Sequence, residues 1–222
     1  MAQVLETEPG IYHCLRVTCG VAVHITCVSF TVFVAALARP GSSLFSWHPF
    51  LMTLAFSFLM TEAVLLFSPH SSPLQKAPHK SKARCHWVLQ CACAACAGLG
   101  LAAIVCNKHL NGKPHFTSWH GVAGLLTACG LGAQCLGGLP LLYPRLLKGR
   151  SLARLKRYHA ASGLLAYLLG TASLLLGMSS LWFAAAVPGP AWYLAAACPV
   201  LGALLVMSQV TGAYVARKAL RP

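Results

Sequence analysis

The chain alternates between long apolar segments and short polar connectors. Each apolar segment exceeds the ~18 residues that indicate a membrane span, and at ~1.5 Å per residue each is long enough to cross a hydrocarbon core of ~30 Å. Six spans are predicted, at residues 17–38, 48–68, 86–106, 120–142, 159–182 and 191–214. The pattern therefore predicts an all-α integral membrane protein with six transmembrane helices, and not one or two soluble domains.

The composition agrees with a membrane location. Of the 222 residues, 57% are hydrophobic and 9% are charged, whereas soluble domains average about 25% charged residues. The N-terminus lacks the basic region and cleavage site of a secretory signal peptide, so the apolar run from Val17 is interpreted as a retained first span. The net charge of +14 does not indicate a nucleic-acid partner, because the basic residues lie in short loops and form no single basic face.

The basic residues are divided unequally between the two sides of the membrane. With six spans, 14 of the 17 Lys and Arg residues fall on the side of both termini and of the loops after the second and fourth spans; the other side has Arg39, Lys108 and Lys113. Cytoplasmic loops carry the excess of Lys and Arg in membrane proteins. The sequence thus predicts a cytoplasmic N-terminal segment (1–16), a six-helix transmembrane domain (17–214) and a cytoplasmic C-terminal tail (215–222).

Most of the eleven cysteines lie inside apolar runs and are interpreted as small packing residues, not as a disulfide framework. Cys93 and Cys96 match a C-x-x-C pattern, but no second pair accompanies them, so a zinc site is not expected there. No C-x-x-C-H motif occurs, which argues against covalently attached haem.

Four histidines carry the main chemical signal. His48, His86, His120 and His159 each begin one of spans two to five, so each is separated from the next by about one span and one loop. A single histidine at the edge of a span can cap a helix or bind a headgroup. Four at equivalent positions of consecutive spans indicate a function, because ionisable residues in membrane helices are costly.

The direction of the spans pairs these histidines. Spans two and four begin on the same face of the membrane, so His48 and His120 share the non-cytoplasmic side. Spans three and five begin on the opposite face, so His86 and His159 share the cytoplasmic side. Each pair is placed to hold one cofactor between the helices of a four-helix core formed by spans two to five. Spans four and five repeat spans two and three, because His120 and His159 follow His48 and His86 at a nearly constant offset along the chain.

The ligand set favours haem over other metals. Zinc prefers four protein ligands, and the three acidic residues of the chain are too few for carboxylate-bridged metal sites. Haem supplies its own equatorial nitrogens and needs only two axial ligands. Two axial imidazoles leave no open coordination position, which favours electron transfer over oxygen chemistry. The sequence predicts two haem b groups per chain.

Glycines are dense in the candidate haem helices, and Gly163, Gly170 and Gly177 recur every seven residues. They either make room for a porphyrin or allow close packing of membrane helices. Both interpretations stay open.

Short strings surround the histidines: Ser46-Trp47-His48-Pro49 with Met52, Arg84-Cys85-His86-Trp87, His120-Gly121, and Tyr158-His159-Ala160-Ala161-Ser162-Gly163. Together with the four-histidine pattern they resemble the cytochrome b561 family of transmembrane, ascorbate-linked reductases. The resemblance extends over nearly the whole chain.

The resemblance implies an enzyme that carries electrons from cytoplasmic ascorbate to monodehydroascorbate or ferric iron on the luminal side. Lys80 and Arg84 match basic residues near the ascorbate site of the family, and His109 matches a polar residue near the acceptor site. The family also suggests an endoplasmic reticulum or cytoplasmic vesicle membrane. A homodimer is kept as a candidate assembly.

Two features depart from the family pattern. The end of span two, residues 62–68, has no arginine where better-known members carry one, and His120 follows Ser118-Trp119 where they place Ser-Trp after the histidine.

Other polar residues have more than one interpretation. The basic loops either concentrate an anionic donor or only orient the protein. Glu62, the one acid inside a predicted span, either takes part in proton transfer or bonds to a haem-ligand histidine, or it is a structural polar neighbour; the last is favoured. His24 has no obvious partner in the sequence and is expected to be buried and hydrogen-bonded. The alternative functions are a haem-free transporter with a histidine relay, or a membrane scaffold.

Overall fold

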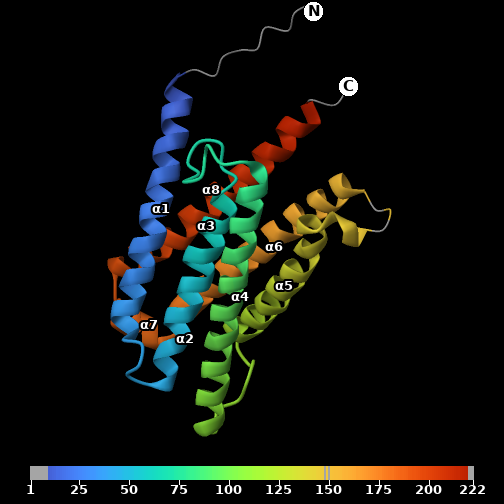
Figure 1. Cartoon of the computed structure of the whole chain (residues 1–222). Helices are drawn as coiled ribbons and strands as arrows, with labels where there is room; N and C mark the ends of the chain where they lie inside the picture. Colours follow the sequence, from blue (N-terminus) through green and yellow to red (C-terminus); the bar gives the residue numbers. More distant parts are fainter. Residues whose placement is uncertain (1–9, 148, 150, 220–222) are drawn as a thin grey trace, which may run out of the picture.

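The computed structural model describes residues 10–147, 149 and 151–219 and is helical (Figure 1). Glu6, Glu8, Lys148, Arg150 and Arg221 lie outside the described residues, as do most of the predicted segment 1–16 and the end of the predicted tail 215–222. The helices are α1 (Gly10–Ala38), α2 (Leu44–Thr53), the π-helical turn η1 (Leu54–Leu59), α3 (Met60–Leu65), α4 (His79–Leu110), α5 (Trp119–Leu142), the 3-10 turn η2 (Pro144–Leu147), α6 (Leu152–Met178), α7 (Leu181–Ala186) and α8 (Pro190–Ala219).

The prediction of six membrane-spanning helices is confirmed. Six helical segments are long and apolar enough to cross a membrane, and α2, η1 and α3 together form the second of them, Leu44–Leu65. Their ends differ from the predicted spans: α4 begins seven residues before His86, and α6 begins seven residues before His159. An apolar run reports only the hydrocarbon core, whereas a helix continues through the headgroup layer, which adds roughly 5–8 Å on each side. His86 and His159 therefore lie about two turns inside their helices, whereas His120 is the second residue of α5, as predicted, and His48 the fifth of α2.

Serine caps start the helices that carry the site. Ser43 and Ser46 form a capping box at the start of α2, and Ser118 and Ser151 accept main-chain hydrogen bonds at the starts of α5 and α6. The fifth span ends at Met178, four residues earlier than predicted. A short additional helix, α7, begins after Ser179 and Ser180.

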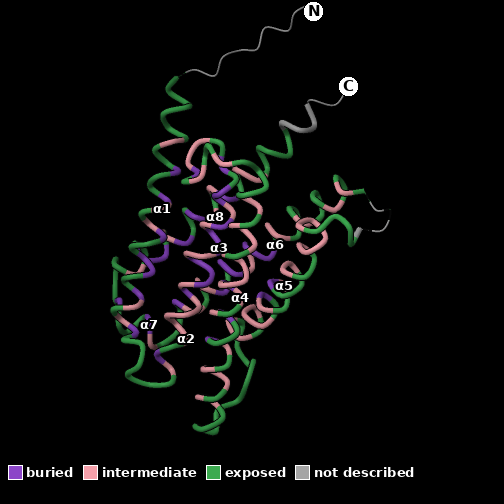
Figure 2. The backbone as a smooth tube through the Cα atoms, in the orientation of Figure 1, coloured by how far each residue is buried: buried purple, intermediate pink, exposed green. Residues whose placement is uncertain are grey.

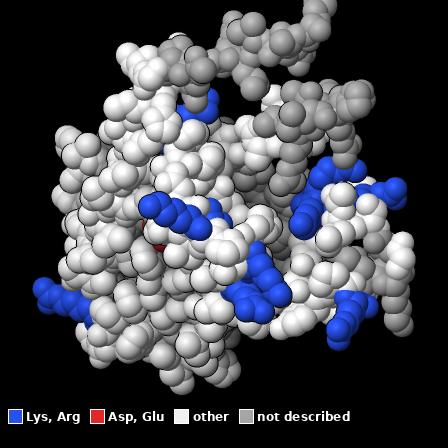
Figure 3. Space-filling model, turned by 45° about the horizontal axis from the view of Figure 1, so that its top comes forward, with Lys and Arg blue, Asp and Glu red and all other residues white. Residues whose placement is uncertain are grey.

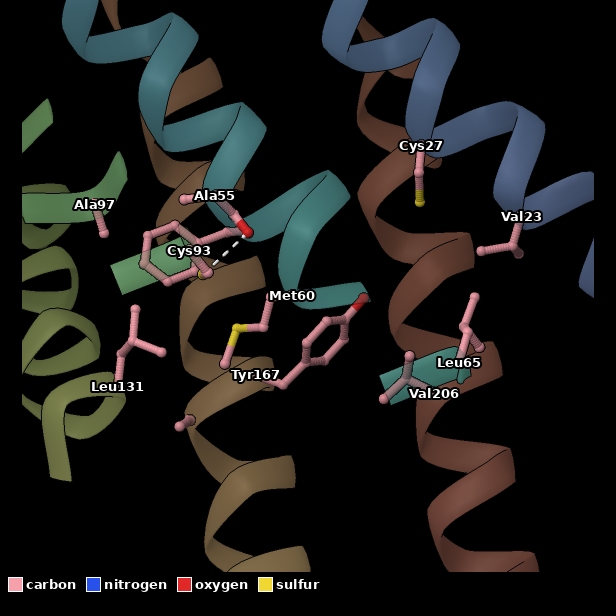
Figure 4. Close-up of a cluster of buried hydrophobic side chains, with 12 residues drawn as sticks. Val23, Cys27, Ala55, Met60, Leu65, Cys93, Ala97, Leu131, Tyr167 and Val206 are labelled. Atoms are coloured by element: carbon pink, nitrogen blue, oxygen red, sulfur yellow. Dashed lines mark hydrogen bonds between the residues drawn. The ribbon is translucent and has the colours of Figure 1, made fainter. Parts of the chain in front are cut away.

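The hydrophobic core lies halfway along the bundle. Cys93 of α4 is fully buried, and its thiol donates to the Ala55 carbonyl in the π-helical turn at 3.2 Å (Figure 4). On α6, the Tyr167 hydroxyl lies 2.9 Å from the Thr61 hydroxyl of α3. Leu131 of α5 and Val206 of α8 belong to the same buried cluster. This core therefore joins the second and third spans to the fourth, fifth and sixth.

The outward faces suit contact with lipid. Figure 2 shows buried positions along the middle of the bundle and exposed ones around it. Exposed apolar side chains follow the outer faces of several spans, among them Val32, Leu99, Leu126, Leu165 and Leu204. Exposed aromatic residues lie near the span ends: Trp47, Trp119 and Tyr193 at one end, and Tyr12, Tyr143 and Tyr158 at the other. This is the distribution of a multi-pass membrane protein.

The start of α1 and the end of α8 lie at one end of the bundle, together with the connections 66–78 and 143–151 (Figure 1). We call this the basic end, because the exposed Lys and Arg side chains gather there (Figure 3). The described residues at this end include Arg16, Lys76, Lys80, Lys82, Arg84, Arg145, Arg154, Lys156 and Arg157, whereas Arg39, Lys108 and Lys113 lie at the opposite, far end. The cytoplasmic position of the basic end stays a prediction.

Gly170 tests the packing of the bundle. A Cβ at this position would lie 3.1 Å from Phe56 Cδ1 and 3.2 Å from Thr127 Cγ2, closer than ordinary contacts. We expect Gly170→Ala to lower the apparent melting temperature in detergent, because overpacking a tight core costs about 1–3 kcal/mol. Gly132→Ala on α5 is the matched control, since no atom lies within 4 Å of the added Cβ. Equal melting temperatures would contradict tight packing at Gly170.

Candidate functional site

The far-end pair consists of His48 on α2 and His120 on α5. Their ring centroids lie 5.9 Å apart. His48 Nδ1 donates to the Gly100 carbonyl of α4 at 3.0 Å, and His120 Nδ1 donates to the Ser173 carbonyl of α6 at 2.9 Å. Because a carbonyl can only accept, each Nδ1 carries the ring hydrogen and each Nε2 keeps its lone pair. This is the tautomer in which an imidazole binds a metal through Nε2.

The basic-end pair consists of His86 on α4 and His159 on α6. Their ring centroids lie 6.3 Å apart. His86 Nδ1 donates to the Ala63 carbonyl of α3 at 2.8 Å. The His159 ring lies against α5, where a Cβ at Gly138 would be 3.4 Å from its Cε1 atom. The structure thus brings together the same pairs that span direction predicts.

The internal repeat extends to the hydrogen-bond acceptors. The step along the chain from His48 to His120 is nearly the same as the step between their acceptors, Gly100 and Ser173. On α4, His86 precedes Gly100 by the same interval as His159 precedes Ser173 on α6. This interval is about four helical turns, or ~21 Å, which is the separation of the two pairs along the bundle.

The two pairs fit haem b. An imidazole nitrogen binds a metal at about 2 Å, so two imidazoles on opposite sides of one iron have ring centroids about 6 Å apart. Both observed separations agree with this value. Within the described part of the chain, no group of three or more His, Cys, Asp and Glu residues is arranged to hold a metal ion. Two ligands are sufficient for a metal that brings its own equatorial nitrogens.

Unpaired polar atoms mark the basic-end site. The side-chain oxygens of Gln90 and Gln134 are buried without a hydrogen-bond partner among the described residues, as is that of Gln209. Gln90 lies one helical turn after His86, and Gln134 lies one turn before Gly138, which faces His159. Buried polar groups are normally paired, so two such atoms beside one histidine pair agree with a site that receives a further group.

Gly163, Gly170 and Gly177 on α6 permit the close approach of neighbouring side chains, which agrees with the predicted close packing; room for a porphyrin stays a prediction. A Cβ at Gly177 would lie 3.0 Å from His120 Cε1, so this glycine makes room for a candidate ligand ring. Gly170 instead permits close packing against Phe56 and Thr127, and Gly163 lies beside the side-chain oxygen of Gln134.

The predicted substrate residues lie at opposite ends of α4. Lys80 and Arg84 are exposed, one turn apart on the helix, and Arg84 lies two residues before His86. His109 is exposed in the last turn of α4, at the far end. Their roles in binding substrates stay predictions.

His24 and Glu62 form a contact that the sequence did not reveal. His24 Nδ1 lies 2.7 Å from a Glu62 carboxylate oxygen, and Nε2 donates to the Ser71 carbonyl at 2.9 Å. His24 is thus hydrogen-bonded, as expected, but the absence of an obvious partner was misleading. The hydrogen bonds of the Glu62 carboxylate go to His24 and to none of the four candidate ligand histidines, which agrees with the interpretation as a polar neighbour. The signal was present in the sequence: these are polar residues in neighbouring predicted spans, at similar depth.

Comparison with known proteins decides the family. The family model for eukaryotic cytochrome b561 matches residues 47–184, a range that includes all four histidines. The chain belongs to the eukaryotic cytochrome b561 family. This match runs from α2 to α7, so it contains both histidine pairs and the four-helix core around them.

Curated relatives extend the similarity to the whole chain. The chain is 59% identical to transmembrane reductase CYB561D2 from Homo sapiens and 58% identical to the protein of that name from Bos taurus, in each case over 100% of both chains. It is 45% identical to probable transmembrane reductase CYB561D1 from Homo sapiens, over 95% of this chain and 92% of that one. The similarity to these relatives therefore extends over α1 and α8, which lie outside the family match.

Gly177 tests the far-end site. We expect Gly177→Ala to lower haem content, because the added Cβ forces the His120 ring to move away from the position set by Ser173. Haem per chain, measured on purified protein, should fall below the value for Gly137→Ala, a control on α5 with no atom within 4 Å of the added Cβ. Equal haem content in the two variants would contradict the placement of a ligand at His120.

Proposed function

We propose that this protein is a transmembrane reductase with two haem b groups, which carries electrons from cytoplasmic ascorbate to monodehydroascorbate or ferric iron on the luminal side. The observation that carries the proposal is the geometry of the histidines: two pairs, each spaced like two axial ligands, at opposite ends of one bundle. Membership in the cytochrome b561 family supports haem b, and the names of the relatives support a transmembrane reductase.

In this proposal His86 and His159 hold the haem at the basic end, and His48 and His120 hold the haem at the far end. Haem b, when bound at each pair, would supply an iron that accepts and releases one electron. The carbonyls of Ala63, Gly100 and Ser173 fix the ring orientation and tautomer of three of the ligands. Fixed ligands keep the change in geometry on electron transfer small.

The bundle between the pairs keeps water out. Ala55, Cys93 and Leu131 are almost completely buried there, and Phe56 packs closely against Gly170. A dry core lowers the local dielectric between the two histidine pairs. In this proposal the electron passes directly from one site to the other. Passage across the membrane then requires both histidine pairs.

The basic end suits an anionic donor. Ascorbate is a monoanion at neutral pH, and Lys80 and Arg84 lie on the same helix as His86, within its first turns. Exposed positive charge raises the local concentration of an anion. When the ascorbate monoanion gives up one electron it also releases one proton to water, and the product is monodehydroascorbate.

The far end offers an exposed histidine to an acceptor. His109 is exposed there, next to Lys108, whose ammonium donates to the Pro114 carbonyl at 3.0 Å. An imidazole can bond to an oxygen of monodehydroascorbate or to a ferric complex. The proposed membrane is that of the endoplasmic reticulum or of cytoplasmic vesicles, and the proposal holds for a monomer or a homodimer.

Transfer across a sealed membrane is the test of the proposal. Protein in liposomes loaded with ascorbate should reduce a membrane-impermeant ferric complex outside, and His86→Ala and His48→Ala should each abolish the reaction. Electron transfer fails in both because each variant interrupts one of two sites in series. Ferric reduction that persists in either variant, or that never occurs with ascorbate inside, would overturn the proposed route or donor.

Substitution of Lys80 and Arg84 tests whether these residues bind the donor or only orient the protein in the membrane. We expect Lys80→Ala with Arg84→Ala to raise the KM for ascorbate about tenfold at low ionic strength, with unchanged haem content, because two attractive charges are lost. Arg39→Ala with Lys113→Ala, which also removes one Arg and one Lys but at the far end, is the charge-matched control. If the KM is unchanged in the double variant of Lys80 and Arg84, these residues serve only orientation.

A further inference from the structure

His24 joins three parts of the chain near the basic end. It lies on α1, which is outside the four helices that carry the candidate ligands, and yet its ring is only 23% exposed. One nitrogen faces the Glu62 carboxylate of α3, and the other donates to the Ser71 carbonyl in the connection between α3 and α4. A histidine and a carboxylate in neighbouring membrane spans are costly unless they are paired, so the presence of this pair calls for a role.

The hydrogen-bond partners fix the protons of this group. The Ser71 carbonyl can only accept, so His24 Nε2 carries a hydrogen. One further proton lies between Nδ1 and the carboxylate, either on the ring as an ion pair or on Glu62 as a neutral pair. In both cases the group is neutral overall, and His24 is held from both sides.

The segment 66–78 is tied to α1 at two further points. A Cβ at Gly20 would overlap the Ser71 side chain, so only a glycine permits this close approach. The rings of His13 and His70 meet edge to face, with centroids 5.3 Å apart. Three contacts from α1 therefore hold one side of the segment, as its place beside α1 in Figure 1 also shows.

The other side of the segment contacts the candidate donor site. Ser68 Oγ accepts from the main-chain nitrogen of Ser71 at 3.2 Å and from its hydroxyl at 2.9 Å. The neighbouring residue, Phe67, places its ring centroid 5.4 Å from that of His86 and 5.5 Å from that of His79. A continuous chain of contacts thus runs from His24 through Ser71, Ser68 and Phe67 to His86.

We infer that His24 is a positioning residue for electron uptake: with Glu62, it holds the segment 66–78 so that Phe67 packs against His86 and the start of α4 presents Lys80 and Arg84 to the donor. The inference rests on the proposed function for the identity of the donor. It assigns α1 a task, since α1 supplies no candidate haem ligand. It also explains why an acid lies in span two without contacting a haem ligand.

Two substitutions of the pair separate a tether from a proton-transfer site. In Glu62→Gln the amide group can donate to Nδ1 while Nε2 still donates to Ser71, so the tether persists without the shared proton. In His24→Leu with Glu62→Leu both hydrogen bonds are lost, and folding is maintained because an apolar pair often replaces a buried ion pair without loss of stability. Tyr167→Phe is the control, since it removes a buried bond to Thr61, next to Glu62, without touching the segment 66–78.

The experiment measures haem content, hydrogen–deuterium exchange of residues 66–78, and the kinetics of ascorbate oxidation in the full-length protein. We expect the double Leu variant to keep its haem, to exchange faster in this segment, and to lose about tenfold in kcat/KM for ascorbate, because a small misplacement lowers reactivity strongly. Electron exchange with a ferric complex at the far end should be unchanged. Glu62→Gln and Tyr167→Phe should behave like the unmodified protein.

A second route to the same displacement is Gly20→Ala, which pushes Ser71 away, with Gly10→Ala on the same helix as control because no atom lies within 4 Å there. Unchanged exchange and unchanged kcat/KM in both the double Leu variant and Gly20→Ala would overturn the inference. An equal loss in Glu62→Gln would overturn it in favour of proton transfer. If ascorbate fails to reduce even the unmodified protein, the proposed donor is wrong, and the exchange measurement alone decides whether His24 holds the segment.

Discussion

Three hydrogen bonds from histidine Nδ1 to main-chain carbonyls set the geometry on which this membrane protein depends. The carbonyls of Gly100 and Ser173 lie inside helices, where a carbonyl oxygen with two lone pairs can accept a second donor, and the carbonyl of Ala63 lies in the last turn of α3. In a membrane no water competes for these bonds. Each one fixes a ring to a neighbouring helix and leaves Nε2 free, so helix packing and ligand orientation become the same constraint. The buried contacts around Cys93 and Tyr167 maintain that packing at the level between the two pairs.

Much of this arrangement follows from the order of apolar runs and histidines. The number of spans fixes their directions, and direction alone puts His48 and His120 at one end of the bundle and His86 and His159 at the other; helix packing then brings the rings of each pair together. The apolar runs also located the helices, but not their ends, because α4 and α6 continue about two turns beyond the hydrocarbon region before His86 and His159. The short helix α7 and the π-helical turn at Leu54–Leu59 were not predicted, since neither has a distinctive apolar period.

Other features of the site have no signature in side-chain identity. A main-chain acceptor such as Gly100 or Ala63 is chosen by position, so no residue type announces it. The contact of Phe67 with His86 depends on how the segment 66–78 folds back, which is set by the serine bonds and by the close approach to Gly20. Glu62 and His24 were visible as unusual residues, but their wide separation along the chain concealed that they are partners.

The helices thus form an inner and an outer set. The spans from α2 to α6 carry the candidate ligands and are contained in the cytochrome b561 match, whereas α1 and α8 pack around them. Gln209 of α8 donates to the Val64 carbonyl at 3.0 Å, and His24 of α1 contacts Glu62, so both outer helices attach to α3 near the basic end.

The most direct test of two separate haem sites is haem stoichiometry in histidine double variants, made with ample haem supply. The account predicts two haem b groups per chain in the unmodified protein. It predicts one when both members of a pair are replaced, as in His48→Ala with His120→Ala, and none when one member of each pair is replaced, as in His48→Ala with His86→Ala. Equal haem content in these two double variants would contradict the pairing, and an unmodified protein without haem would return the choice to a transporter or a scaffold.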